Sequence, residues 1–396
     1  MDKNAIKYEQ LRQRLREEFM YYTGDGSERG TSLPMERRYV GKYGLTGYWA
    51  DGTWWQGHYV ALLATEYARL KREGKSTEAT LKELRCAIEV YNRLDLNAEK
   101  FWKSDSIPQL NGFYLRDDIQ RSDTTRMHLD AISSDYASNY NRPNATGNTP
   151  SQDQAWGSYI GFALAQKLVD DPKLHQEIAE ISCRMVKGMQ HVDSAGRTHW
   201  EIVNPVNGMM LQRESDIQWL QYAHAEIGTL LSAQNLHFGK SDRGRWRSMW
   251  HFVQNNMLMA KNGNFRWYGI LAMTAILNDG GNGDCYAWLV KTCDKIVKKR
   301  PDLQQTLIFP HLPLINLVLY GKEGKDLVPR TLYDAYLDSA PADGAITKII
   351  DGKSVRTPAP WNSGSLFCPW HNKDIGDANM IDFLLLYNLV ELIYGE

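Results

Sequence analysis

Two classes of helix alternate along this 396-residue chain, and the alternation restricts its possible folds more than any other feature. The first class is apolar on nearly every side, so each of its helices must be covered by protein all round. Its segments are residues 56–72, 154–169, 216–232, 266–277, 307–320 and 379–394. The second class has an apolar stripe on one face only, at spacings of three and four residues. Its segments are residues 4–20, 77–94, 173–190, 243–260, 284–299 and 327–337.

Buried helices that alternate with one-sided helices are what a double ring requires. We expect an all-α fold, an (α/α)6 toroid of six helical hairpins, with the buried helices as the inner wall and the amphipathic helices as the outer wall. No linker divides the chain, so residues 1–396 are expected to form a single toroid domain. Long loops lead into the inner helices. Alternating stretches in them, such as residues 112–119 and 197–203, predict small β hairpins.

Charge and hydropathy argue against two classes of partner. The formal net charge is −1 and no basic stripe stands out, so we expect no nucleic-acid partner. No apolar run approaches the ~20 residues that span a bilayer, so we expect no membrane insertion. The charged, amphipathic first segment is unlike a signal peptide. A soluble protein is expected, either cytoplasmic or, if a signal has been removed, periplasmic or secreted. Nothing indicates a protein partner.

Motif and cysteine patterns favour neither a metal nor a cofactor. The chain has five cysteines, an odd number, and their spacings match no metal motif. Cys285 and Cys293 are eight residues apart on one predicted helix. Their Cα atoms are therefore about 12 Å apart, too far for a disulfide. We find no HExxH, P-loop, Rossmann glycine run or GxSxG motif. The expectation is a protein without a metal site and without a cofactor.

Aromatic and polar side chains crowd the starts of the inner helices, which would share one rim in an alternating ring. Flat aromatic faces cover the C–H faces of sugars, and carboxylates, amides and guanidinium groups match vicinal hydroxyls. A single aspartate at a helix start, such as Asp153 or Asp216, can simply be an N-cap. Capping does not explain the neighbouring aromatics and amides, so we predict a carbohydrate site. Its predicted substrate-binding residues are Asp51, Trp54, Trp55, His58, Arg116, Gln154, Trp156, Arg213, Asp216, Trp267, His311, Trp361 and His371.

Two aspartates are the predicted catalytic residues. Hydrolysis of a glycoside typically uses one protonated and one ionised carboxyl group. Asp153 begins the second inner helix, and Asp118 shares a face with Arg116 if residues 112–119 are a strand. These two carboxyls favour a glycoside hydrolase acting on an oligo- or polysaccharide. Two alternatives stay open: a polysaccharide lyase or sugar epimerase with a His or Tyr base, and a non-catalytic sugar-binding toroid.

Short motifs carry a resemblance to a known family. They are WADGTWW at residues 49–55, GFYLRDD at 112–118, SQDQAWGSYIGFALA at 151–165 and IDFLLLYNLVELIY at 381–394. With them the chain resembles the six-hairpin glycosidase superfamily of (α/α)6 toroid enzymes, in particular bacterial proteins of polysaccharide degradation. The resemblance implies a cavity at the rim where the inner helices begin, and a hydrolase or lyase acting on sugars. It also implies that Asp51, Arg116, Asp153 and Trp156 line that cavity.

Overall fold

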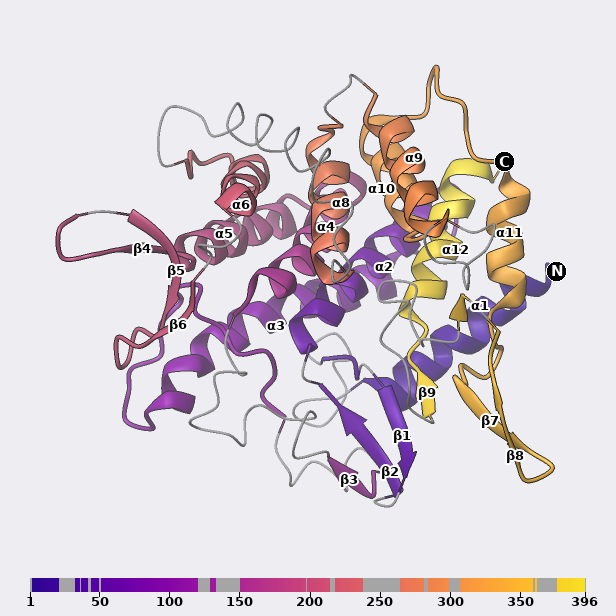
Figure 1. Cartoon of the computed structure of the whole chain (residues 1–396), viewed down its shortest axis with the longest axis horizontal. Helices are drawn as coiled ribbons and strands as arrows, with labels where there is room; N and C mark the ends of the chain where they lie inside the picture. Colours follow the sequence, from indigo (N-terminus) through magenta and orange to yellow (C-terminus); the bar gives the residue numbers. More distant parts are fainter. Residues whose placement is uncertain are drawn as a thin grey trace.

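A computed structural model describes most of the chain. The described residues are 2–20, 33–35, 37–41, 44–49, 51–119, 129–132, 150–196, 198–213, 218–237, 264–280, 284–298, 307–358, 360–361 and 376–395. They are mostly helical, with short strands in the connections, which confirms the predicted all-α class (Figure 1). The amphipathic helix predicted over residues 243–260 and Cys368 lie outside the described residues.

The apolar helices begin and end close to their predicted positions, because an all-round apolar pattern is a local signal. They are α2 (Gly52–Arg72), α4 (Gln152–Leu168), α6 (Gln218–Ser232), α8 (Asn264–Leu277), α10 (His311–Tyr320) and α12 (Ile381–Tyr394). The amphipathic helices are α1 (Lys3–Arg14), α3 (Glu78–Trp102), α5 (Pro172–Gly188), α9 (Cys285–Lys298) and α11 (Arg330–Ser339). A π-helical turn, Leu15–Phe19, continues α1.

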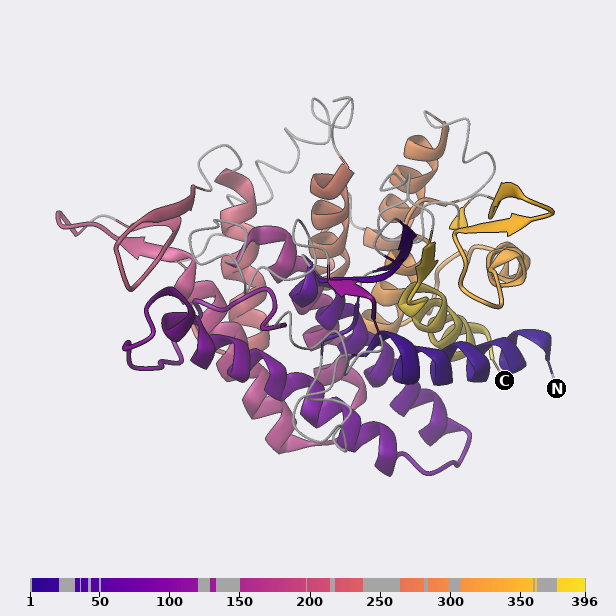
Figure 2. The ribbon, with the colours of Figure 1, turned by 90° about the horizontal axis from the view of Figure 1, so that it is seen from below.

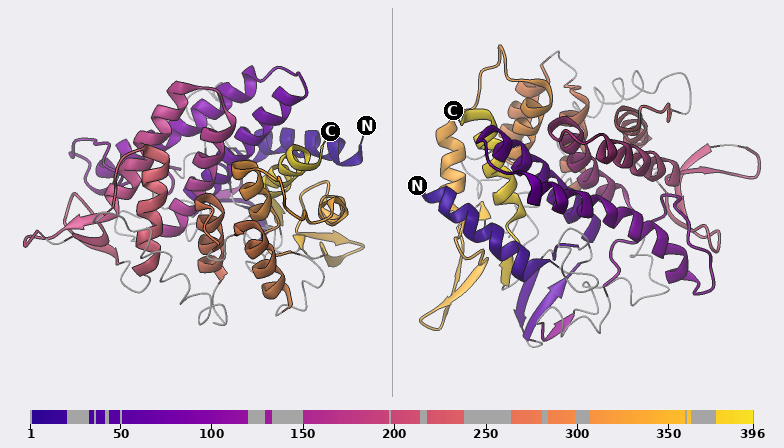
Figure 3. Two further views of the ribbon diagram at one scale, coloured as in Figure 1. Left: turned by 90° about the horizontal axis from the view of Figure 1, so that it is seen from above. Right: turned by 180° about the vertical axis from the view of Figure 1, so that it is seen from behind.

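Each apolar helix contacts the next apolar helix along the chain. The pairs are α2 with α4, α4 with α6, α6 with α8, α8 with α10, and α10 with α12, and α12 in turn contacts α2. Among the amphipathic helices, α3 contacts α2 and α5, while α9 contacts α8 and α10. Figures 2 and 3 show α6, α8 and the pair α9 and α10 as a row of neighbouring helices. The apolar helices thus pack on one another, and most of their described side chains are buried.

Glycines allow α2 and α4 to pack backbone against backbone. A Cβ atom added at Gly57 would lie 2.2 Å from the carbonyl carbon of Gly157. A Cβ atom added at Gly161 would lie 2.3 Å from the carbonyl oxygen of Gly57. Real Cβ atoms do not approach backbone this closely, so only glycine fits at this crossing. The crossing brings the first turns of the two helices together.

Replacing Gly57 by alanine is expected to destabilise the protein, although alanine favours an isolated helix by about 1 kcal/mol. The added methyl group must push α4 away from α2, at a cost of at least about 1–3 kcal/mol. Urea unfolding of Gly57→Ala against wild type measures the loss. Gly74→Ala is the control, since nothing lies within 4 Å of an added Cβ there and only its positive φ of 67° adds strain. An equal loss in both variants would argue against close packing as the cause.

Short strands tie the connections together. A four-stranded sheet has the order β3 (Ala131–Ile132), β2 (Gly44–Tyr48), β1 (Arg37–Gly41) and β9 (Gly376–Ala378). Strand β2 leads into α2 and β9 leads into α12, and β1 pairs with both, so the sheet holds these two helix starts at one edge of the molecule (Figure 1).

Two further small sheets project from the helical body (Figure 1). They contain β4 (Gln190–Val192), β5 (Thr198–Val203) and β6 (Met210–Arg213), and β7 (Thr347–Ile350) with β8 (Lys353–Arg356). Strand β5 confirms the strand predicted over residues 197–203. The strand predicted over residues 112–119 is wrong, because this segment has no strand partner and instead packs on helices. A Cβ atom added at Gly112 would lie 1.9 Å from the carbonyl oxygen of Arg184 in α5.

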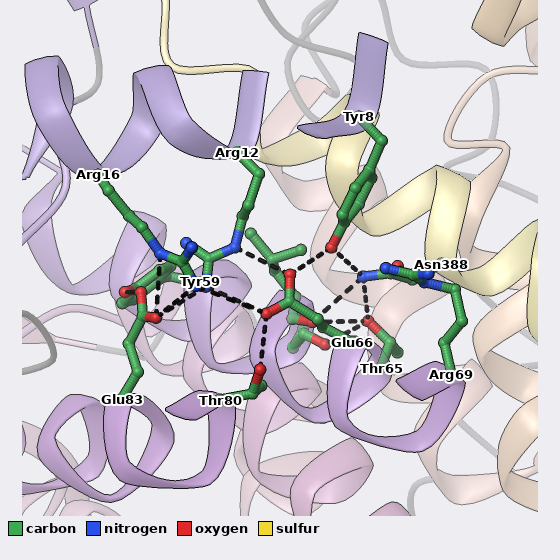
Figure 4. Close-up of polar contacts among 12 residues, drawn as sticks. Tyr8, Arg12, Arg16, Tyr59, Thr65, Glu66, Arg69, Thr80, Glu83 and Asn388 are labelled. Carbon is green, nitrogen blue, oxygen red and sulfur yellow. Dashed lines mark hydrogen bonds and ion pairs between the residues drawn. The ribbon is translucent and has the colours of Figure 1, made fainter. Parts of the chain in front are cut away.

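A buried ionic network joins α1 to α2 and α3 (Figure 4). Arg12 donates to Oε2 of Glu66 at 2.9 Å and to Oε2 of Glu83 at 2.9 Å, and its side chain is 2% exposed. The hydroxyls of Tyr8 and Tyr59 donate to Glu66 and Glu83, respectively. One guanidinium group therefore links two carboxylates on two helices.

Candidate functional site

Contacts between side chains show that the starting turns of the apolar helices meet. Gln154 in α4 bonds to Asp51, the N-cap of α2, with 3.1 Å between Nε2 and Oδ1. Nε2 of His58 in α2 bonds to the hydroxyl of Tyr268 near the start of α8. The same hydroxyl lies 3.1 Å from Nε2 of His311, the first residue of α10. The predicted gathering of these helix starts is confirmed for α2, α4, α8 and α10.

Asp51 and Asp153 form a carboxyl pair at this meeting point. Burial raises the pKa of Asp51 to about 6, and the negative charge of Asp153 acts in the same direction. Arg116 lies 3.8 Å from Oδ1 of Asp51 and, with the Gln154 amide, opposes the rise. The side chains of Arg116 and Asp51 remain 20% and 18% exposed, so solvent or a ligand can reach them. Asp51 therefore combines a raised pKa with partial access to solvent, as a general acid requires.

Helix capping does not account for either carboxylate. Asp51 occupies the N-cap position of α2, yet its side chain makes no capping hydrogen bond. Asp153 lies inside the first turn of α4, whose N-cap is Ser151. The Ser151 hydroxyl donates to Asp153, so this serine orients the carboxylate instead of capping the helix. The simple alternative of an N-cap role is therefore removed for Asp153.

Asp118 is held elsewhere. Arg93 in α3 donates to both of its carboxylate oxygens, at 2.8 and 3.0 Å, and the Asp118 side chain is 10% exposed. The prediction that Asp118 faces the same way as Arg116 assumed a strand, and this segment is not one. Tyr114 does lie near the pair: it is buried, and its pKa is raised by burial and by neighbours that include Asp153. Among the described carboxyls, Asp51 is the one whose pKa the charge of Asp153 is shown to raise.

The described tryptophans among the predicted sugar-binding residues are packed inside the protein. Trp54, Trp55, Trp156 and Trp361 are each 3% exposed or less. The Trp54 ring lies 4.7 Å from the Tyr268 ring, and Trp156 packs on Gly269 of α8. Trp361 donates its N–H to the carbonyl oxygen of Tyr336 in α11. Open aromatic platforms were expected from these positions, but these rings are buried among the helices.

His58 and His311 lie beside Trp54 and Tyr268 in the same buried cluster. Burial lowers the pKa of His58 to about 3, and burial together with His58 lowers the pKa of His311 well below its usual range. Both rings are neutral, and Tyr268 lies between them. His224 and Tyr159 form a similar buried contact, 3.1 Å long, between α6 and α4. These groups are 1% exposed or less, so none of them meets solvent in this conformation.

The remaining predicted residues are only partly described. Asp216 and His371 lie outside the described residues, while Arg213 ends β6 and Trp267 lies in the first turn of α8, with side chains that are not described. Sequence reasoning missed Ser151 and Tyr268 as members of the site. Both stand in the segments where the apolar helices begin, and that position was the signal that could have found them.

No group of three or more His, Cys, Asp or Glu side chains in the described part of the chain could hold a metal ion. None of the helices in the described ranges has the length and apolar character needed to cross a bilayer.

Comparison with known proteins gives no relative of this chain: no family model, no curated protein and no solved structure matches it.

Proposed function

We propose that this chain is a carbohydrate-active enzyme, a glycoside hydrolase whose inner and outer helices form an (α/α)6 toroid. Asp51 is the general acid, and Asp153 is the second carboxylate that completes the pair. The observation that carries this proposal is the partly accessible Asp51 carboxyl at the start of α2, which bonds to Gln154 of α4 and lies near enough to Asp153, in the first turn of α4, for their charges to interact. Arg116 and the buried aromatic residues frame them.

The ionisation of Asp51 supports this division of roles. A general acid must hold its proton near the working pH, and burial raises the pKa of Asp51 to about 6. The charge of Asp153 contributes to the rise, as expected for two carboxyls that share a site. Asp51 takes the role that the sequence had given to Asp118, since Asp118 is engaged by Arg93.

The closed ring of contacts among the apolar helices supports the toroid. Contacts run from α2 through α4, α6, α8, α10 and α12 back to α2, while α4 also contacts α10, and the amphipathic helices α3, α5 and α9 pack on members of this series. A solenoid would leave its first and last helices apart. Such a ring would bring the helix starts to one rim, and the starts of α2, α4, α8 and α10 do contact one another.

A lyase or epimerase needs a basic side chain that reaches the substrate. In the described part of the chain, His58, His311 and Tyr268 are candidates for such a base; all three are buried, and both histidines bond to the Tyr268 hydroxyl. Their burial favours the hydrolase over the lyase. A non-catalytic sugar-binding protein has no need for a carboxyl pair with one raised pKa, and this pair therefore favours an enzyme over a binding module.

A panel of neutral and acidic oligo- and polysaccharides tests the proposed function. The expected result is release of new reducing ends from at least one substrate, without near-ultraviolet absorbance from unsaturated sugars. Unsaturated products would show a lyase. Calorimetric binding of a sugar with no turnover of any substrate on the panel would show a binding module. Asp51→Asn protein serves as the blank in every assay.

A further inference from the structure

Gln154 uses both ends of its side-chain amide inside the protein. It is fully buried, and Oε1 accepts the backbone N–H of Trp54 at 2.9 Å and the hydroxyl of Thr53. Because a backbone N–H can only donate, Oε1 is the accepting end of the amide and Nε2 must donate. Nε2 donates to Oδ1 of Asp51 at 3.1 Å. The amide thus bridges the starts of α4 and α2.

The Trp54 backbone, whose N–H donates to Gln154, is also hydrogen-bonded through its carbonyl group. The carbonyl oxygen of Trp54 accepts a hydrogen bond from Nδ1 of His58 at 2.9 Å. A carbonyl only accepts, so His58 carries its proton on Nδ1, and the bare Nε2 of this neutral ring accepts the Tyr268 hydroxyl. The Tyr268 oxygen then accepts Nε2–H of His311. This hydrogen-bonded chain runs from α10 through α8 to α2.

We propose that Gln154 is a positioning residue, which orients the Asp51 carboxyl group and holds it beside Asp153, and that it does not bind substrate. Thr53 and Trp54 fix the amide, and the chain through His58 fixes Trp54 in turn. The proposal rests on the proposed function for its catalytic meaning. The effect of Gln154 on Asp51 itself does not depend on any activity.

The charges around Asp51 show what removal of the amide does. Burial and Asp153 favour the protonated acid, whereas Arg116 and the Gln154 N–H favour the carboxylate. A hydrogen bond to the charged form lowers the pKa of an acid. Without the amide, Asp51 keeps its burial and the repulsion from Asp153 but loses one of the two groups that oppose them. Its titration must move to higher pH.

Carbon-13 NMR titration of the aspartate carboxyls tests this, with the Asp51 signal assigned by its loss in Asp51→Asn. In Gln154→Met the Asp51 midpoint is expected to rise by about one pH unit or more, as loss of a charge-assisted hydrogen bond implies. In Gln154→Glu, one carboxylate oxygen can still accept from Thr53 and Trp54, but the other takes the place of Nε2 and cannot donate to Asp51. The Asp51 midpoint is expected to rise in this variant too.

Gln56→Met is the matched control. Gln56 is as buried as Gln154, but its amide donates to the carbonyl oxygen of Ala87 in α3, at 2.8 Å. This variant removes a buried amide from the same region without touching Asp51, so its Asp51 midpoint is expected to equal that of wild type. If Gln154→Met folds poorly, Gln154→Glu decides the test alone.

Midpoints in both Gln154 variants that match wild type would overturn the proposal, whatever happens to activity. With an active substrate, a positioning role predicts a lower kcat with KM within ~2-fold of wild type, whereas a substrate-binding role raises KM. A raised KM with unchanged kcat therefore also counts against the proposal. A shifted midpoint in a protein that cleaves no sugar keeps the role of Gln154 and removes the proposed function instead.

Discussion

Replacing Asp51 by asparagine is expected to lower kcat at least ~100-fold, the low end of what a general acid contributes. Asparagine keeps an oxygen that can accept the Gln154 N–H but has no proton to give a leaving group. Wild-type kcat/KM is expected to fall with rising pH above about 6, where Asp51 loses its proton, and the residual activity of Asp51→Asn is expected to lack this limb. Steady-state kinetics from pH 4 to 9 on the best substrate of the panel measures both.

The same substitution is expected to stabilise the protein at neutral pH. The folded-state pKa of Asp51 is raised from 3.8 to about 6, so folding favours the protonated acid and the folded protein loses stability as pH rises through this window. The loss reaches up to about 3 kcal/mol above pH 6, at 1.36 kcal/mol per pKa unit. Asparagine carries no charge at any of these pH values and therefore does not cause this loss. Urea unfolding of Asp51→Asn should therefore give a gain at pH 7.5 that vanishes near pH 4.

Asp118→Asn is the control for both effects. Asp118 is also a partly buried aspartate, but its partner is Arg93 and its charge is compensated. The variant is expected to keep kcat within ~5-fold of wild type and to lose stability, because Arg93 loses its charged partner. A large loss of kcat in Asp118→Asn with a small loss in Asp51→Asn would return the acid–base role to Asp118.

The helices could be predicted from the sequence because their signal is local. Apolar residues on every side of 381–394, or on one face of 173–190, specify helix and burial without knowledge of any partner. The segment 112–119 shows where this reasoning fails. Its alternation is typical of a strand, but a strand needs a neighbour, and here α5 lies against Gly112 while Asp95 accepts the Gly112 N–H at 3.1 Å. Pairing of this kind depends on residues far along the chain.

The same limit explains which parts of the site were predicted. Asp51 and Asp153 were found because helix starts on one side of an alternating fold must meet, whereas Arg116 came from the strand pattern of residues 112–119 and from the family resemblance. Asp118 was chosen because a strand would place it on the same face as Arg116 and Tyr114, but the segment is not a strand and Arg93 in a preceding helix binds Asp118. Gln154 was identified as a site residue, but its contacts with Thr53 and Asp51 give it a supporting position.

Replacing Arg12 by methionine is expected to lower the free energy of unfolding by about 3–5 kcal/mol, since it leaves buried carboxylates without their main counter-charge. The side chains of Glu66 and Glu83 are 5% and 7% exposed, and Arg12 joins them (Figure 4). Urea unfolding at pH 7 measures the loss. Arg16→Met is the control, because Arg16 contacts Glu83 at 2.9 Å but is 30% exposed, and its removal should cost about 1 kcal/mol.

A double variant and a pH series show whether charge is the cause. Burial alone raises the pKa of Glu66, but the charge and hydrogen bonds of Arg12, with the Tyr8 hydroxyl, lower it to about 2. Because the pKa of Glu66 is lowered in the folded state, its ionisation stabilises the protein above pH 4.5, and this stability is lost as the pH falls toward 2. Arg12→Met should flatten that acid limb, and adding Glu66→Gln should recover part of the loss at pH 7 because the uncompensated charge is gone. Equal losses in Arg12→Met and Arg16→Met, with an unchanged acid limb, would mean that packing and not charge holds α1 against α2 and α3.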